Sequence, residues 1–201
     1  MKPNFALSLS VEGIRLLHRS AGGWHSIGDV SFDADDMPAE LAMLRKTAAA
    51  LEPDGVRTKL LIPNDQIKFM TLETPGLSDA ARISEARRAL EGATPYEVDD
   101  LAFDISTDGA QTHIAAVARE TLAEAEAFAT AHRFHPVSFV AQPDDAVFHG
   151  EPFFGPAKAS ETLLDQGDAV EPDEDAVVVH GPDLPTLEDA PAQEPEADQS
   201  Q

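Results

Sequence analysis

The stretch of residues 57–105 constrains the fold of this chain more than any other. It contains an apolar run at residues 60–62 that ends at Pro63, followed by a second strand-like segment at residues 67–72. A helical segment, a Pro95-Tyr96 turn and a further strand-like segment come next. Proline lacks a backbone N–H and therefore tends to end a strand. Strands and helices in this order predict an α/β fold in which residues 60–62 form a central strand.

The residues before this stretch predict a meander and a helix. Phe5, Leu7 and Leu9 alternate with small or polar residues, which is typical of a half-buried strand. Residues 14–19 and 24–32 complete a three-stranded antiparallel meander. Asp36 and Pro38 are signals for a helix start. A 3.6-residue period then places one set of side chains inward: Leu41, Leu44, Ala48 and Leu51.

The residues after Pro75 predict a helix, a hairpin, a helix and a closing strand. Ser78 caps the first helix, whose inward positions are expected to be Ile83, Ala86 and Leu90. Residues 101–106 and 112–118 are strands joined by a turn that contains Asp108-Gly109, a strong hairpin signal. Residues 120–132 form the second helix, and residues 136–141 form the closing strand.

The sequences "LIPNDQIKFMTLETP" and "ATPYEVDDLAFDI", in this order, resemble those of the cytoplasmic actin-like proteins of type IV pilus assembly and type II secretion, the PilM/GspL group. The resemblance covers about residues 5 to 143. It implies one lobe of an actin-like (ribonuclease H-type) fold, with a small inserted α+β subdomain at about residues 64–111. It also implies that this subdomain, or a sheet edge, binds other assembly proteins.

The resemblance further implies that the nucleotide site is degenerate. Actin-like ATPases carry an Asp and nearby glycines in their first hairpin, where the Asp organises magnesium and the glycines let N–H groups approach phosphate. In this chain Ser8 stands where the Asp belongs, and Ser10 stands where the first Gly belongs. We therefore expect a non-catalytic scaffold with no cofactor and no metal. The alternatives are a nucleotide-binding protein that completes its site with a second chain, and an unassigned α/β binding domain.

Composition divides the chain near residue 156. Residues 157–201 hold 13 acidic residues against a single Lys and include five prolines. A segment of this kind buries too little apolar surface to offset the entropy of ordering its backbone, about 1 to 2 kcal/mol per residue. We therefore expect a folded domain at residues 1–156 and a disordered acidic tail at residues 157–201. The apolar run at residues 177–179 could still add a strand to a sheet edge of this or another protein.

The net charge of −23 excludes some classes of partner. It opposes binding to the phosphates of nucleic acid and to an anionic membrane surface. No segment has the apolar run of a signal peptide or of a membrane span, so we expect a cytoplasmic chain without direct membrane insertion. Its expected partners are other proteins, including those of a membrane-associated assembly complex.

Two groups of residues are candidates for binding these partners. Arg82, Arg87 and Arg88 are expected on the outer face of one helix, where they would form a positive patch on an acidic protein. Phe153 and Phe154 form an apolar pair outside the expected elements, which would either anchor a partner or pack the end of the domain onto its core.

Overall fold

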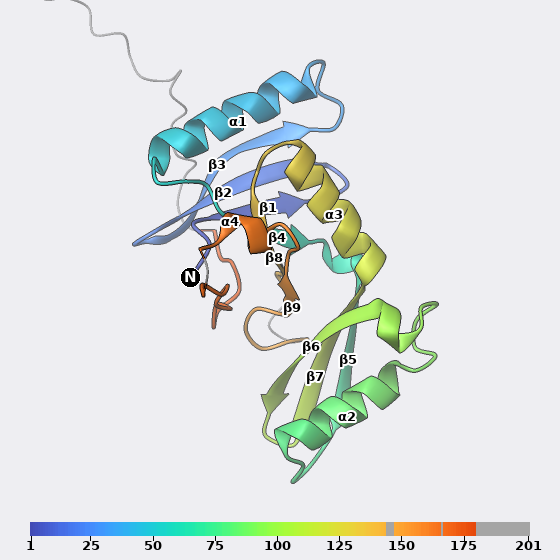
Figure 1. Cartoon of the computed structure of the whole chain (residues 1–201). Coiled ribbons are helices and arrows are strands. Elements are labelled where there is room, and N and C mark those ends of the chain that lie inside the picture. Colours follow the sequence, from blue (N-terminus) through green and yellow to red (C-terminus); the bar gives the residue numbers. More distant parts are fainter. Residues whose placement is uncertain (144–146, 166, 180–201) are drawn as a thin grey trace, which may run out of the picture.

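A six-stranded mixed sheet forms the centre of the computed structural model, which describes residues 1–143, 147–165 and 167–179 (Figure 1). The strand order is β3-β2-β1-β4-β8-β9. The pairs β1–β4 and β4–β8 are parallel, whereas β1–β2, β2–β3 and β8–β9 are antiparallel. The strands are β1 (Phe5–Leu9), β2 (Gly13–Ser20), β3 (Gly23–Ser31), β4 (Thr58–Ile62), β8 (Pro136–Ala141) and β9 (Phe153–Pro156).

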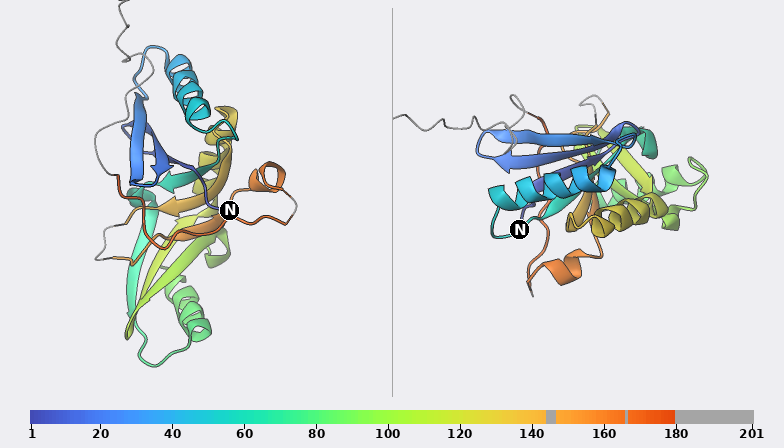
Figure 2. Two further views of the ribbon diagram at one scale, coloured as in Figure 1. Left: turned by 90° about the vertical axis from the view of Figure 1, so that its left-hand side faces the viewer. Right: turned by 90° about the horizontal axis from the view of Figure 1, so that it is seen from above.

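The main core lies between one face of this sheet and the helices α1 (Met37–Leu51) and α3 (Arg119–Ala131) (Figures 1 and 2). Alternation along β1 explains this arrangement, because Phe5 and Leu7 point into the main core and Ala6 points to a smaller cluster on the opposite face. Among the described residues, the helices are too short or too polar to cross a membrane.

The first residues of α1 behave as the sequence predicts. The Asp36 carboxylate accepts a hydrogen bond from the Ala39 N–H at 3.1 Å and caps the helix. Leu41, Leu44 and Ala48 are buried, but the expectation for Leu51 is wrong: it is the last helical residue and is 40% exposed.

A second sheet of three antiparallel strands forms the inserted subdomain, with α2 (Asp79–Leu90) packed on one face (Figure 1). Its order is β5-β7-β6, where β5 is Ile67–Glu73, β6 is Leu101–Asp108 and β7 is Gln111–Ala118. Single 3₁₀ turns at Asn64–Gln66 and Val98–Asp100 precede β5 and β6. The α/β fold with an inserted α+β subdomain is therefore confirmed, and β7, paired along its length with both neighbours, carries the subdomain beyond residue 111.

The described residues after 156 also pack on the domain. A short helix, α4 (Ser160–Leu163), follows β9, and both Ala157 and Val177 are buried. Val179 forms a single parallel bridge with Trp24 on the edge strand β3, so the apolar run lies at the edge of this chain's own sheet without forming a strand. The prediction of disorder from residue 157 is wrong for residues 157–165 and 167–179; residues 180–201 of the expected tail lie outside the described residues.

Candidate functional site

The hairpin that would hold a nucleotide phosphate in an actin-like ATPase is the turn between β1 and β2. Ser8 and Ser10 line a shallow pocket of about 460 Å³ there. The Ser10 hydroxyl donates to the Gly13 carbonyl at 3.2 Å and accepts from the Glu12 N–H at 3.3 Å. The turn therefore uses Ser10 and a backbone N–H for its own closure, and these groups are not directed at a ligand.

Gly13 is required by packing in this hairpin. A Cβ at this position would lie 2.3 Å from the Val30 carbonyl oxygen on β3, a distance that real side chains do not adopt. The acidic side chain nearby, Asp29, forms an ion pair with Arg15. These contacts explain the glycine by the pairing of β2 with β3 rather than by phosphate binding.

Arg87 and Arg88 lie on the exposed face of α2, as the sequence predicts. Their side chains are 51% and 71% exposed. Arg87 forms an ion pair with Asp99, and Arg88 forms one with Glu85 at 2.8 Å. Exposed pairs of this kind contribute about 0 to 1 kcal/mol, so a partner's carboxylate could replace either one at small cost.

Arg82 is not part of this surface, and its assignment to a partner site is wrong. It is buried and donates to the hydroxyls of Thr74 at 2.6 Å and Thr112 at 2.7 Å. It also donates to the carbonyls of Leu77, Gly109 and Gln111 at 2.9 to 3.2 Å. The guanidinium thus joins α2 to the turn between β6 and β7 and serves the fold.

The sequence left two roles open for Phe153 and Phe154: anchoring a partner, or packing the end of the domain onto its core. In the structure both residues pack onto the domain. Both lie in β9, the last strand of the main sheet. Phe154 is buried in the main core, and half-buried Phe153 packs against the smaller cluster on the opposite face. The Phe153 N–H donates to the Asp104 carboxylate of β6 at 2.9 Å, which ties the two sheets together. An anchor for a partner is wrong for Phe154, because its ring is already covered.

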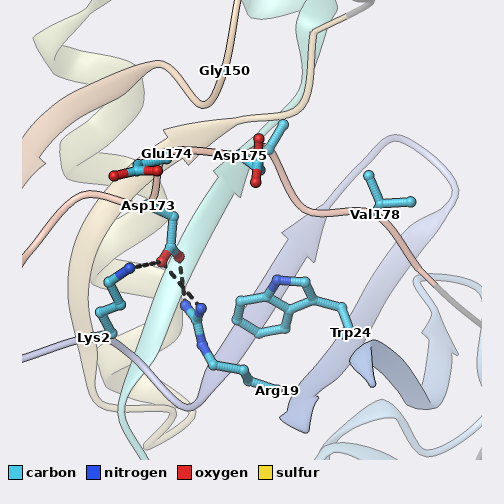
Figure 3. A pocket seen from close by; sticks show the side chains of 10 residues that line it. Lys2, Arg19, Trp24, Gly150, Asp173, Glu174, Asp175 and Val178 are labelled. Atoms are coloured by element: carbon cyan, nitrogen blue, oxygen red, sulfur yellow. Dashed lines mark hydrogen bonds and ion pairs between the residues drawn. The ribbon is translucent and has the colours of Figure 1, made fainter. Parts of the chain in front are cut away.

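A cluster of charged groups that the sequence did not reveal lies on the face of the main sheet opposite α1 and α3. Figure 3 shows three of its members, Lys2, Arg19 and Asp173, beside Trp24. The centre of the cluster is Lys59 of β4, whose ammonium contacts the carboxylates of Glu151 and, at 2.7 Å, Asp173. Arg19 of β2 also binds Asp173, through two hydrogen bonds of 2.5 and 3.1 Å. The Trp24 ring lies against both cations, 4.4 Å from Arg19 and 4.8 Å from Lys59. Lys59 itself could have revealed this cluster, because a charged side chain buried in a central strand requires an oppositely charged partner.

The two carboxylates of this cluster have opposite pKa shifts. Burial raises the pKa of Glu151 to about 7, although the Lys59 ammonium opposes this change. Burial also acts to raise the pKa of Asp173, but hydrogen bonds from Arg19 and Lys59 outweigh it and hold that pKa below its usual range. Asp173 is therefore the firmly ionised ligand of the two cations, and the cluster is suited to binding an anionic group.

Asp173 reaches this cluster from the segment that follows α4. Lys2 adds a third cation at 3.3 Å from the Asp173 carboxylate (Figure 3). The cluster opens into a surface pocket of about 630 Å³. The segment after α4 lines part of this pocket with Asp173, Glu174, Asp175 and Val178. The chain thus supplies both the cationic site and the acidic segment that fills it.

Comparison with known proteins gives likenesses in structure alone. No family model and no curated protein matches the sequence. The PilM–PilN type IV pilus biogenesis complex is similar over 70% of this chain and 48% of that chain, with a TM-score of 0.50 and 14% identity. The cytoplasmic domain of EpsL, an inner membrane component of the type II secretion system of Vibrio cholerae, covers 87% of this chain. That match spans 84% of the EpsL chain, with a TM-score of 0.48 and 14% identity.

A third structure, from Bacteroides thetaiotaomicron, is described as a protein of actin-like ATPase fold and unknown function. It gives a TM-score of 0.35 and 13% identity over 69% of this chain and 52% of its own. This chain thus spans about half the length of the matched chains of the PilM–PilN complex and of the Bacteroides protein. The chain has the fold of the PilM–PilN structure, as one lobe of the actin-like type that its sequence predicted.

Proposed function

We propose that this chain is a non-catalytic, protein-binding scaffold module of a pilus-assembly or type II secretion system, and that α2 forms its contact surface. The observation that carries the proposal is the outer face of α2. Ile83 is 48% exposed there, beside Arg87 and Arg88. An exposed aliphatic side chain flanked by arginines has the composition of a protein interface.

The neighbouring loop extends this surface. Tyr96 is 43% exposed and lines a shallow pocket of about 440 Å³ together with Arg87 and Asp99. Tyrosine and arginine are the residues that most often contribute strongly to binding energy. A partner with an apolar side chain for Ile83 and a carboxylate for an arginine would match the surface.

Two further observations support the proposal. The similar PilM–PilN structure is, by its name, a complex of two proteins in pilus biogenesis. The hairpin turn of Ser8 and Ser10 closes on itself and lacks the acid that organises magnesium. Protein binding at the cytoplasmic side of a membrane-associated assembly is the role that follows for this lobe.

The test is affinity purification of the full chain from its native cells, followed by binding measurements with the purified partner. We expect Ile83→Asp and the double variant Arg87→Glu, Arg88→Glu each to weaken binding at least tenfold. Lys46→Glu is the matched control, because Lys46 is exposed on α1, away from this surface. Equal binding by all four proteins would refute α2 as the contact surface.

A further inference from the structure

The segment of residues 168–179, here called the strap, crosses the face of the main sheet opposite α1 and α3. Its first part is tied to the N-terminus: the Glu171 N–H donates to the Met1 carbonyl at 2.9 Å, and the Glu171 carboxylate accepts from the Met1 ammonium at 3.0 Å. Its last part forms the single bridge between Val179 and Trp24. The strap contains no helix or strand.

Two side chains of the strap are buried against the sheet. Asp173 binds Arg19 and Lys59. Val177 is fully buried among five residues of the sheet: Ala6, Leu17, Trp24, Leu61 and Val140. Between these two positions, Glu174 and Asp175 are exposed and face the pocket (Figure 3). The attachments of the strap that are buried against the sheet are therefore one carboxylate and one aliphatic side chain, four residues apart, in addition to its contacts with Met1 and its bridge to Trp24.

Without Asp173, the buried ammonium of Lys59 beneath the strap would still have an ion-pair partner. Glu151 is buried and also contacts the Lys59 ammonium, so Lys59 would retain a counter-ion. Removing one partner of a buried charge is costly only when the other is left unpaired. Arg19 and Lys2, which would lose their carboxylate, are 29% and 48% exposed and could be hydrated.

We propose that Arg19, Lys59 and Trp24 form a binding site for acidic peptide segments, and that the strap is an internal ligand which a partner's segment displaces. The occupant is a segment of a partner protein with a carboxylate four residues before an aliphatic side chain. Its carboxylate binds the Arg19 guanidinium in place of Asp173, and its aliphatic side chain is buried in place of Val177.

The chemistry of the site supports this occupant. Arginine binds a carboxylate through two parallel hydrogen bonds, a geometry that Asp173 already shows. The aromatic face of Trp24 keeps both cations in position when the carboxylate leaves. The stabilisation lost when Val177 leaves its buried position is recovered when an equivalent aliphatic side chain of the partner is buried there. The inference rests on the proposed role in protein binding, but it concerns a different face from α2.

The test measures binding of a synthetic peptide with the sequence of residues 168–179 to the full chain, by fluorescence anisotropy of a label on the peptide. In the wild type the internal strap competes, which lowers the apparent affinity in proportion to the fraction of open sites. The release variant Asp173→Asn, Val177→Asn removes this competition and leaves the site intact. We expect it to bind the peptide at least tenfold more tightly than the wild type does.

Three controls define the result. Asp175→Asn makes the same change of charge on an exposed part of the strap and should bind like the wild type. A peptide carrying the Asp173→Asn change should bind the release variant at least tenfold more weakly. Trp24 is the only tryptophan of the chain, so its intrinsic fluorescence should differ between the release variant and the wild type.

Equal affinities of the release variant and the wild type, or no binding by a folded release variant, would overturn the proposal. Asp173→Asn alone, which keeps Val177 buried, serves as the second variant if the double variant does not fold, and should bind at least threefold more tightly than the wild type. The Arg87→Glu, Arg88→Glu variant should bind the peptide like the wild type. Failure of this site and failure of the α2 surface are thus separate outcomes.

Discussion

Arg82 and Ile83 are neighbours on α2 whose exposure is the reverse of what their chemistry suggests. Arg82, Ala86 and Leu90 lie four residues apart and form the buried face, whereas Ile83 is exposed. Burial of the arginine is possible because the Arg82 guanidinium has five acceptors around it. The sequence could not predict this, since those acceptors are hydroxyls and turn carbonyls that only the folded hairpin brings together.

Replacing Arg82 by alanine is expected to destabilise the protein by about 2 to 4 kcal/mol. The change leaves the buried hydroxyls of Thr74 and Thr112 without their charged donor, and each such loss costs about 1 to 3 kcal/mol. Arg88→Ala is the matched control and should stay within about 0.5 kcal/mol, because its side chain is exposed. Urea unfolding of the three proteins gives both values. Similar stabilities of the two variants would show that Arg82 has no structural role.

The titration of Glu151 predicts a pH dependence of the free energy of unfolding. The pKa of Glu151 is raised from 4.5 to about 7 by burial, so between these values the folded state holds a proton that the unfolded state releases. The free energy of unfolding therefore falls as the pH rises through this interval. Asp173, with its pKa below the usual range, stays ionised throughout and adds no slope.

We expect the wild type to lose up to about 2 kcal/mol more than Glu151→Gln between about pH 5 and about pH 8. The amide has nearly the same size as the carboxyl group but does not titrate. Urea unfolding of both proteins at the two pH values measures the difference. Parallel pH profiles would mean that Glu151 is already ionised at pH 5 in the folded protein.

At the scale of elements, the strands and helices up to residue 141 could be predicted because each has its own local signal. Alternation of apolar with small or polar residues predicted β1, and the Asp108-Gly109 turn predicted the hairpin of β6 and β7. Asp36 predicted the start of α1. The strap could not be predicted in this way. Its average composition is that of a disordered segment. Its order depends on Asp173 binding residues more than a hundred positions earlier in the chain and on the burial of Val177 by strands of the main sheet.

A chain that ends after Pro156 is therefore expected to melt well below one that ends after Val179. The shorter chain lacks buried Ala157 and Val177 and the ligand of Arg19, a loss of about 3 kcal/mol. For a protein of this size, such a loss lowers the melting temperature by about 6 to 12 °C. Thermal unfolding followed by circular dichroism compares the two chains. Equal melting temperatures would show that the segment after β9 contributes no stability.

At the scale of the whole molecule, the order of strands and helices predicted an α/β fold, and the resemblance to the PilM/GspL group implied the lobe. A meander, a helix and a central strand followed by an insertion leave few ways to build the mixed sheet, since parallel strands need a crossover between them. The helices α1 and α3 precede β4 and β8, and both cover the same face. The charged cluster on the opposite face could not be predicted, because Arg19, Lys59 and Asp173 are distant in sequence and meet only in the folded chain.

The same lobe predicts the response to nucleotide. We expect isothermal titration with MgATP to show no binding in the micromolar range. The hairpin offers Ser8 where an acid would organise magnesium, and the Ser10 hydroxyl and the Glu12 N–H are bonded within the turn. Gly13 is accounted for by its contact with Val30. The variant Ser8→Ala should behave like the wild type, whereas a stoichiometric isotherm that this change abolishes would establish a nucleotide site at the hairpin. That result would favour a nucleotide-binding lobe completed by a second chain over a scaffold.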